Sequence, residues 1–178
     1  MDSGAACYQC YMEGDDGAFE ELVAMYAHGL ILFISGYVRN LTTAEDLMED
    51  TFCELILHKN RFRGRCAFKT YLYSIARYKA INYIRKNEKV ISFAEMEPVA
   101  DVDLDDLIQR RDRDRRLYDA LDNIRKEYRE ALHLFYFEDM DYEQIAAVLK
   151  KNKSQVKNLL HRGKQSLREL LVRDGFEY

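Results

Sequence analysis

The chain contains 178 residues, of which 48% are hydrophobic and 33% charged, and its formal net charge is −4. This length fits one domain or two small ones, and the apolar content excludes an intrinsically disordered protein. The negative total argues against nucleic-acid binding only if the distribution of charge is ignored. Residues 13–54 contain ten acids and one base, residues 59–89 contain ten bases and one acid, and residues 150–173 contain eight bases and one acid. Two separate basic segments are typical of a protein that binds phosphate.

The longest apolar run, residues 30–34 with their neighbours, is far too short to cross a bilayer, and the first three residues lack the basic start of a signal peptide. We therefore expect a cytoplasmic protein with no membrane insertion of its own. The four cysteines, Cys7, Cys10, Cys53 and Cys66, are expected as free thiols. Cys7 and Cys10 form a C-x-x-C pair with no second pair and no His at zinc spacing, which favours coincidence over a metal or redox site. We expect no metal and no other cofactor.

After a short polar lead, residues 18–39 carry apolar side chains at helical spacing. Gly29 and Gly36 interrupt this pattern, so we expect two helices packed into a core. The next helix is predicted over residues 44–59, capped by Thr43 with Asp46 at the third helical position. Its buried stripe consists of Ala44, Met48, Phe52 and Leu55.

The opposite side of that helix is acidic, with apolar members. It consists of Asp46, Glu49, Asp50, Cys53 and Leu57. A solvated face is one interpretation of these charges, and docking onto a basic partner helix is the other.

The segment 60–86, NRFRGRCAFKTYLYSIARYKAINYIRK, interleaves cations with aromatic rings. We expect a loop that carries Arg61, Phe62, Arg63 and Arg65, followed by a helix that carries Tyr71, Tyr73, Tyr78 and Tyr83. On this helix the core-facing residues are Phe68, Leu72, Ile75, Ala76 and Tyr83, Arg77 lies opposite, and Lys69 and Tyr73 flank the apolar face. Rings beside Lys and Arg can stack the bases of a single strand. The alternative is a buried helix with tyrosines in core and rim positions.

Helical periodicity lapses from residue 88 to about residue 115. This segment contains the only proline, Pro98, and a string of aspartates over residues 101–106. We interpret residues 89–115 as a flexible acidic linker between two small helical domains, residues 1–88 and 116–178.

Helical patterns return over residues 117–124 and 131–136, and two capping pairs follow them. These pairs, Asp141 with Gln144 and Asn152 with Gln155, mark the starts of two helices joined by a tight turn. The sequence therefore predicts a helix-turn-helix. The second helix has an apolar arc made of Val156, Leu159, Leu160, Gly163, Leu167, Leu170 and Leu171. Its outward arc holds Ser154, Gln155, Lys157, Asn158, His161, Arg162 and Gln165. Such side chains suit a recognition helix in the major groove, although a solvated polar face is the alternative.

The order of these segments resembles the extracytoplasmic-function (ECF) class of the sigma-70 family of transcription initiation factors. AEDLMEDTF resembles the polymerase-docking helix, FRGRCAFKTYLYSIARYKAINYIRK the strand-opening segment, and YEQIAAVLKKNKSQVKNLLHRGKQSL the reader of the upstream promoter element. The chain departs from the family pattern at Lys150, where Gly is frequent, and at Gly163, where Ala is usual.

The resemblance implies an all-α initiation factor that is not an enzyme and whose partners are core RNA polymerase, promoter DNA and an anti-sigma factor. Asp46, Glu49 and Asp50, with Cys53 and Leu57 beside them, are implied to contact a coiled coil of the largest polymerase subunit, and the polymerase flap is a second implied contact. The implied −10 element residues are Arg61, Phe62, Arg63, Arg65, Lys69, Tyr71, Tyr73, Arg77, Tyr78 and Asn82. The implied −35 element residues are Ser154, Gln155, Lys157, Asn158, His161, Arg162 and Lys164.

Two other functions stay open at this point. A stand-alone helix-turn-helix regulator would use the first half of the chain for dimerisation or sensing. A thiol-based sensor or enzyme would require the four cysteines to matter.

Overall fold

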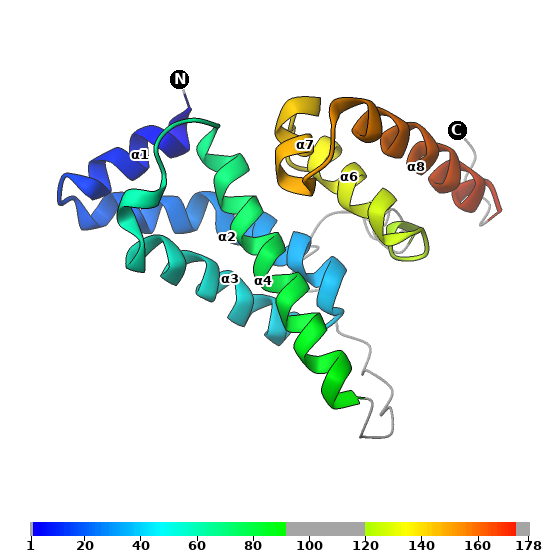
Figure 1. Ribbon diagram of the computed structural model, residues 1–178, viewed down its shortest axis with the longest axis horizontal. Coiled ribbons are helices and arrows are strands. Elements are labelled where there is room, and N and C mark those ends of the chain that lie inside the picture. The colour runs from blue at the N-terminus through cyan, green and yellow to red at the C-terminus, as the bar shows by residue number, and fades with distance from the viewer. Residues whose placement is uncertain (1, 92–119, 174–178) are drawn as a thin grey trace. The chain divides into compact units, whose positions relative to one another are not determined.

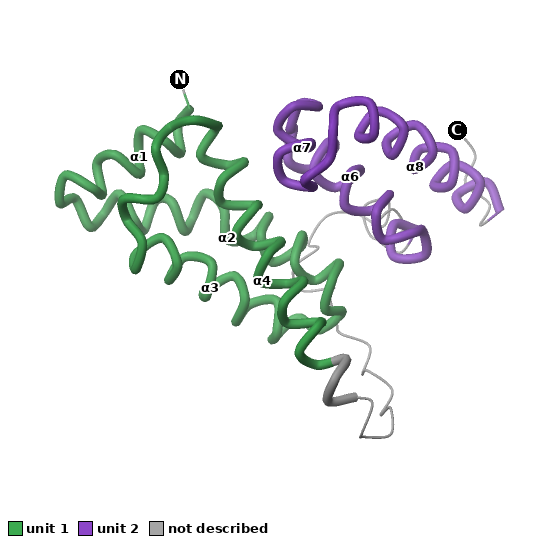
Figure 2. Tube along the Cα trace, viewed as in Figure 1, with its two compact units in different colours: residues 1–102 green, residues 103–178 purple. Residues whose placement is uncertain are grey.

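The computed structural model describes residues 2–91 and 120–173, and every regular element in these ranges is helical (Figure 1). The chain divides into two compact units, Met1–Val102 and Asp103–Tyr178 (Figure 2). The predicted all-α class with two helical domains is therefore confirmed. The predicted linker, residues 89–115, lies outside the described residues apart from the end of the fourth helix.

The first helix, α1 (Ser3–Met12), replaces the polar lead expected from the sequence. The Asp2 side chain accepts a hydrogen bond from the Ala5 amide, which satisfies one free N–H at the start of the helix. Tyr8 and Tyr11, three residues apart, are both buried, so the helix contributes two aromatic rings to the core of unit 1.

A single helix, α2 (Asp16–Val38), occupies the stretch for which two helices were predicted. That prediction was wrong because a continuous buried face offsets the roughly 1 kcal/mol that each interior glycine costs. Within the part of the chain that the structure describes, α2 is the one helix long and apolar enough to cross a membrane, with a mean hydropathy of 1.5. A core helix meets the same criteria, and α2 packs as one, against α1, α3 and α4.

The third helix, α3 (Leu41–Leu57), begins three residues before the predicted start. Asn40 is the cap, with its Oδ1 accepting from the Thr43 amide at 2.8 Å, so the prediction of Thr43 as the cap was wrong. Asparagine caps at least as well as threonine, and the earlier start adds most of a turn. The buried residues are Ala44, Leu47, Thr51, Phe52 and Leu55, whereas Met48 is half-buried.

A short 3-10 turn, η1 (Lys59–Arg61), leads through a loop into α4 (Phe68–Ile91), which packs against both α2 and α3. Two neighbours make the buried arc of α4 broader than one apolar stripe. Tyr73 falls within this arc and is 0% exposed, with its ring centroid 5.2 Å from that of Phe33. The prediction that Tyr73 flanks the core was therefore wrong, and so was the core position of Tyr83, which is exposed.

Unit 2 contains α6 (Lys126–Tyr136), α7 (Tyr142–Leu149) and α8 (Lys153–Arg173), preceded by a helical turn at residues 120–122. Both predicted capping boxes are present, at Asp141 with Gln144 and at Asn152 with Gln155. Lys150 ends α7 in the left-handed region, at φ 54°, and this reversal starts the turn into α8. Gly163 lets α8 approach α6, because a Cβ there would lie 3.2 Å from atoms of Leu132 and Tyr128.

Candidate functional surfaces

The acidic face of α3 points away from the core of unit 1. All five predicted docking residues, Asp46, Glu49, Asp50, Cys53 and Leu57, are exposed. The three carboxylates form no ion pair with another residue that the structure describes, so their charge is available to a partner. Leu57 is 74% exposed, and its neighbour Ile56, which sequence reasoning missed, is also exposed. The face therefore combines charge with an apolar end, as a docking surface does.

Phe62 packs the basic loop, residues 59–67, against α1 and α4 of the same unit. The Phe62 ring lies 5.8 Å from Tyr8, 5.3 Å from Phe68 and 5.3 Å from Tyr71, measured between centroids. Phe62 is half-buried in this cluster. The ring thus fixes the middle of the loop to the body of the unit, a role that the sequence pattern alone did not indicate.

The arginines of the basic loop differ in their surroundings. Arg61 donates to Glu54 at 2.8 Å, and Glu54 also lies 3.4 Å from His58 and 4.0 Å from Lys79. Arg63 and Arg65 are exposed and form no ion pair within the described ranges. These two guanidinium groups are therefore the ones available for phosphate or bases.

The outward face of α4 brings together Tyr71, Tyr78 and Asn82, which are spaced seven and four residues apart. Tyr78 is 63% exposed, while Tyr71 and Asn82 are half-buried. Burial raises the pKa of the Tyr71 phenol, and the Arg61 guanidinium opposes that shift. Tyr78 is consequently the predicted −10 tyrosine with the most ring surface available for stacking.

The remaining predicted −10 residues lie nearer the core. Tyr73 is buried, and its position excludes direct stacking on a base in this conformation. The Lys69 ammonium lies 5.9 Å from the Tyr73 ring centroid, and Lys69 and Arg77 are both half-buried.

The outward face of α8 carries all seven predicted −35 residues, and all are exposed. They are Ser154, Gln155, Lys157, Asn158, His161, Arg162 and Lys164. Two of them are partly engaged. The Gln155 side chain accepts from the Asn152 amide, and the Lys164 ammonium lies 5.3 Å from the ring centroids of both Phe135 and Tyr136.

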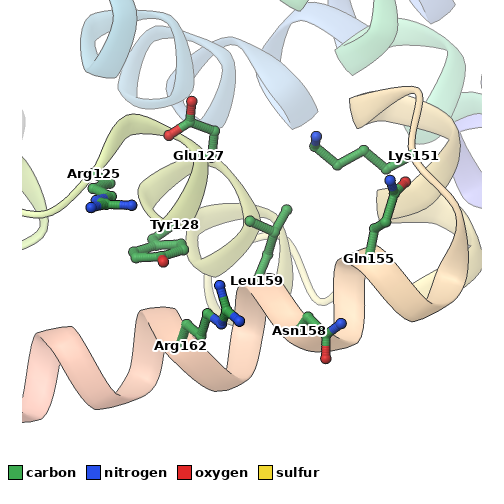
Figure 3. A pocket seen from close by; sticks show the side chains of 8 residues that line it. All are labelled: Arg125, Glu127, Tyr128, Lys151, Gln155, Asn158, Leu159 and Arg162. Carbon is green, nitrogen blue, oxygen red and sulfur yellow. The ribbon is translucent and has the colours of Figure 1, made fainter.

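A pocket of about 350 Å³ adjoins this face, between the first turn of α6 and α8 (Figure 3). Arg162 extends from α8 towards Tyr128 of α6, and Arg125 lies beside the same ring (Figure 3). Lys151, on the turn, adds a third cation to the lining. Sequence reasoning missed Arg125, Tyr128 and Lys151, because only the position of α6 against α8 places them beside Arg162.

The cysteines are free thiols, with Cys7 buried and the other three exposed. Across residues 2–91 and 120–173, the structure groups no three His, Cys, Asp or Glu side chains that could hold a metal ion.

Residues 22–90 match the family Sigma-70 region 2, and residues 114–167 match Sigma-70, region 4. The RNA polymerase sigma factor CarQ of Myxococcus xanthus is 31% identical over 167 residues, which cover 90% of this chain and 93% of CarQ. The ECF RNA polymerase sigma factor SigX of Bacillus subtilis is 28% identical over 159 residues, covering 85% of this chain and 82% of SigX. The solved structure of the sigma factor RpoE in complex with the anti-sigma factor NepR from Bartonella quintana gives a TM-score of 0.69 at 22% identity, covering 86% of this chain and 96% of RpoE. The resemblance inferred from the sequence is confirmed, and the chain belongs to the ECF class of the sigma-70 family, the RNA polymerase sigma factors of transcription initiation.

Proposed function

We propose that this sigma factor docks on core RNA polymerase through the acidic face of α3, binds the −35 element as duplex through α8, and holds opened −10 bases with the basic loop and α4. The observation that carries the proposal lies in unit 1. An exposed acidic face and an exposed basic, aromatic face occur on α3 and α4, which pack against each other. One small unit can therefore contact a basic protein surface and a nucleic acid at the same time.

The energetics of strand opening require the polymerase. Opening one turn of duplex, about ten steps at roughly 1.4 kcal/mol each, costs on the order of 14 kcal/mol. Stacking on an aromatic ring returns roughly 1–3 kcal/mol per base. Of the predicted −10 tyrosines, Tyr78 is exposed, Tyr71 half-buried and Tyr73 buried, so stacking offsets only a small part of that cost. The sigma factor therefore traps opened bases while the polymerase supplies most of the stabilisation.

Unit 2 is suited to duplex DNA. Lys157, Asn158 and His161 occupy the outward face of α8, which follows a capped turn in the arrangement of a recognition helix. Arg162 stands where this face meets the pocket, within reach of a base edge or a backbone phosphate. Arg125 and Lys151, in the same lining, are placed to contact phosphate, which would fix the position of α8 in the groove.

The cellular setting follows from this role. We propose that the protein acts in the cytoplasm, that residues 1–88 form the polymerase and −10 domain, and that residues 116–178 form the −35 domain. An anti-sigma factor is a further proposed partner, supported by the RpoE relative, which is bound by the anti-sigma factor NepR.

The experiment is run-off transcription with purified core polymerase and this chain, followed by mapping of transcript 5′ ends. Promoter-specific transcripts that require the chain support the proposal. Tight footprints on duplex by the chain alone, without any promoter-specific transcript, would instead identify a stand-alone regulator.

A further inference from the structure

We propose that α1 is a clamp for the basic loop, and that Asp2 and Tyr8 are positioning residues that hold this loop in the shape in which it contacts −10 DNA. The inference rests on the proposed function of the loop. Neither residue was expected to have a role, and α1 precedes residues 22–90, which match region 2. Figure 1 shows the chain between α3 and α4 passing beside the N-terminal end of α1.

Tyr8 contacts the basic loop at its start, in its middle and where it enters α4. Its hydroxyl donates to the Lys59 carbonyl at 2.8 Å. Its ring lies 5.8 Å from the Phe62 ring and 5.1 Å from the Phe68 ring, between centroids. One side chain thus restrains three points along the loop, which limits the conformations open to the residues between them.

Asp2 holds the far end of the basic loop with a single carboxylate. Oδ1 accepts from the Ala5 amide of α1 at 3.2 Å, and Oδ2 accepts from the Phe68 amide of α4 at 2.6 Å. The first turn of α4 has no acidic residue of its own, so Asp2 provides both a cap and a negative charge at that helix end. The carboxylate therefore ties the start of α1 to the end of the loop.

The backbone of α1 is close enough to make these contacts because residue 4 is glycine. A Cβ at Gly4 would lie 2.2 Å from the Tyr26 hydroxyl oxygen and 2.9 Å from Cδ1 of Phe68. At the start of the loop, the Lys59 ammonium lies 4.4 Å from the centroid of the Tyr11 ring, which also belongs to α1. The face of α1 that carries Gly4 and Tyr11 thus packs closely against Phe68 and Lys59, at the two ends of the loop.

The hydroxyl of Tyr8 remains a donor across the physiological range. The side chain is buried, and burial raises the pKa of its phenol to about 12. The hydrogen bond to the Lys59 carbonyl therefore does not act as a pH switch in that range.

Besides the contacts from α1, the loop is restrained by the packing of Phe62 on Phe68 and Tyr71 and by the ion pair of Glu54 with Arg61, whose side chain is exposed. Exposed ion pairs stabilise little. Arg63 and Arg65 follow, separated by Gly64 in the left-handed region at φ 67°. The clamp by α1 therefore holds the chain on both sides of these two guanidinium groups, at Phe62 and at Phe68.

The test uses two conservative variants with matched controls. Tyr8→Phe keeps the ring and removes the donor to Lys59, whereas Tyr11→Phe makes the same change on the same helix and keeps the ring beneath Lys59. Asp2→Asn removes the charge and leaves one carbonyl oxygen for two amides, whereas Asp15→Asn alters a cap that serves α2 alone.

Three measurements follow for each variant. The first is amide hydrogen exchange of residues 59–67 in the free chain. The second is open-complex formation by the reconstituted holoenzyme, on a promoter taken from the mapped transcripts, as duplex and with the −10 region already unpaired. The third is the preference among single −10 base changes, which a general loss of stability would not alter.

We expect Tyr8→Phe and Asp2→Asn to speed exchange in the loop by about two- to ten-fold, the effect of one lost hydrogen bond on an equilibrium constant. Open complexes on duplex should fall by a similar factor, −10 preference should relax, and core polymerase binding should match wild type. The controls should change none of these.

Unchanged loop exchange in both variants overturns the clamp. Faster exchange with wild-type −10 preference in an active holoenzyme overturns its role at the promoter. A wild-type chain that gives no promoter-specific transcripts overturns the proposed function and the promoter half of this inference, while hydrogen exchange still decides whether α1 clamps the loop.

Discussion

Tyr73 and Tyr78, five residues apart on α4, should respond in opposite ways to truncation. Tyr73 is fully buried and packs on Phe33 of α2, while the ring of Tyr78 is mostly exposed. Tyr73→Ala removes a large core side chain, and we expect a loss of about 3–5 kcal/mol in the free energy of unfolding. Tyr78→Ala removes little buried surface, so we expect its stability to stay within about 0.5 kcal/mol of wild type.

Substitutions of the same two tyrosines should also differ in their effect on promoter opening. If Tyr78 stacks on an opened base, Tyr78→Ala should weaken the open complex by roughly 1–3 kcal/mol, or about five- to 150-fold in its equilibrium constant. Tyr73→Phe keeps the core ring and should leave opening near wild type. Urea denaturation of the free chain and permanganate footprinting of the holoenzyme measure the two effects. A Tyr78→Ala variant that opens promoters normally, or that unfolds as readily as Tyr73→Ala, would refute this assignment.

Four further variants test the other surfaces and the turn between α7 and α8. Asp46→Arg with Glu49→Arg should abolish pull-down of core polymerase without altering the unfolding midpoint. Arg162→Ala should weaken binding to the −35 element by roughly 1–3 kcal/mol and relax the base preference at one position. Arg125→Ala should instead weaken binding to every sequence and lower the salt dependence of binding by about one phosphate contact. Titration of DNA at several salt concentrations measures both effects. Lys150→Gly should stabilise unit 2 by about 1 kcal/mol in thermal unfolding, because glycine adopts the left-handed conformation without the penalty that lysine incurs.

The docking-face variant and the Lys150 variant each have a control in the same chain. Glu13→Arg with Glu20→Arg makes the same charge change on exposed positions outside α3, and retained polymerase binding there would assign the effect to the docking face. An equal loss across all sequences for Arg162→Ala would make it a phosphate contact. Lys151→Gly introduces glycine at a position without a positive φ, so it should destabilise, and a gain equal to that of Lys150→Gly would contradict the backbone argument.

The outward faces were predicted well from the sequence because they depend on a single helix. On α3 and α8, charge and apolar spacing within one element fix which side is buried, and exposure of Asp46 and Asn158 follows from that alone. The start of α3 was missed because Asn40 and Thr43 are both good caps, and the choice between them depends on how many residues the core can bury. Gly29 and Gly36 were misinterpreted for the same reason, since tertiary packing keeps α2 continuous through both.

The pattern within a single helix could not predict which side chains are covered by neighbouring helices. Three tyrosines show this. Tyr73 is buried and packs on Phe33 of α2, and Tyr78 is exposed. Tyr8 contacts the loop from α1, where Gly4 allows the close approach to Tyr26 and Phe68. The residue type is the same in all three cases, so the difference lies in where each tyrosine sits in the arrangement of α1, α2 and α3 around α4. We therefore assign the proposed base-contacting role to those aromatic and basic side chains that the packing leaves uncovered, and we propose that the same packing sets how firmly the loop that carries the arginines is held.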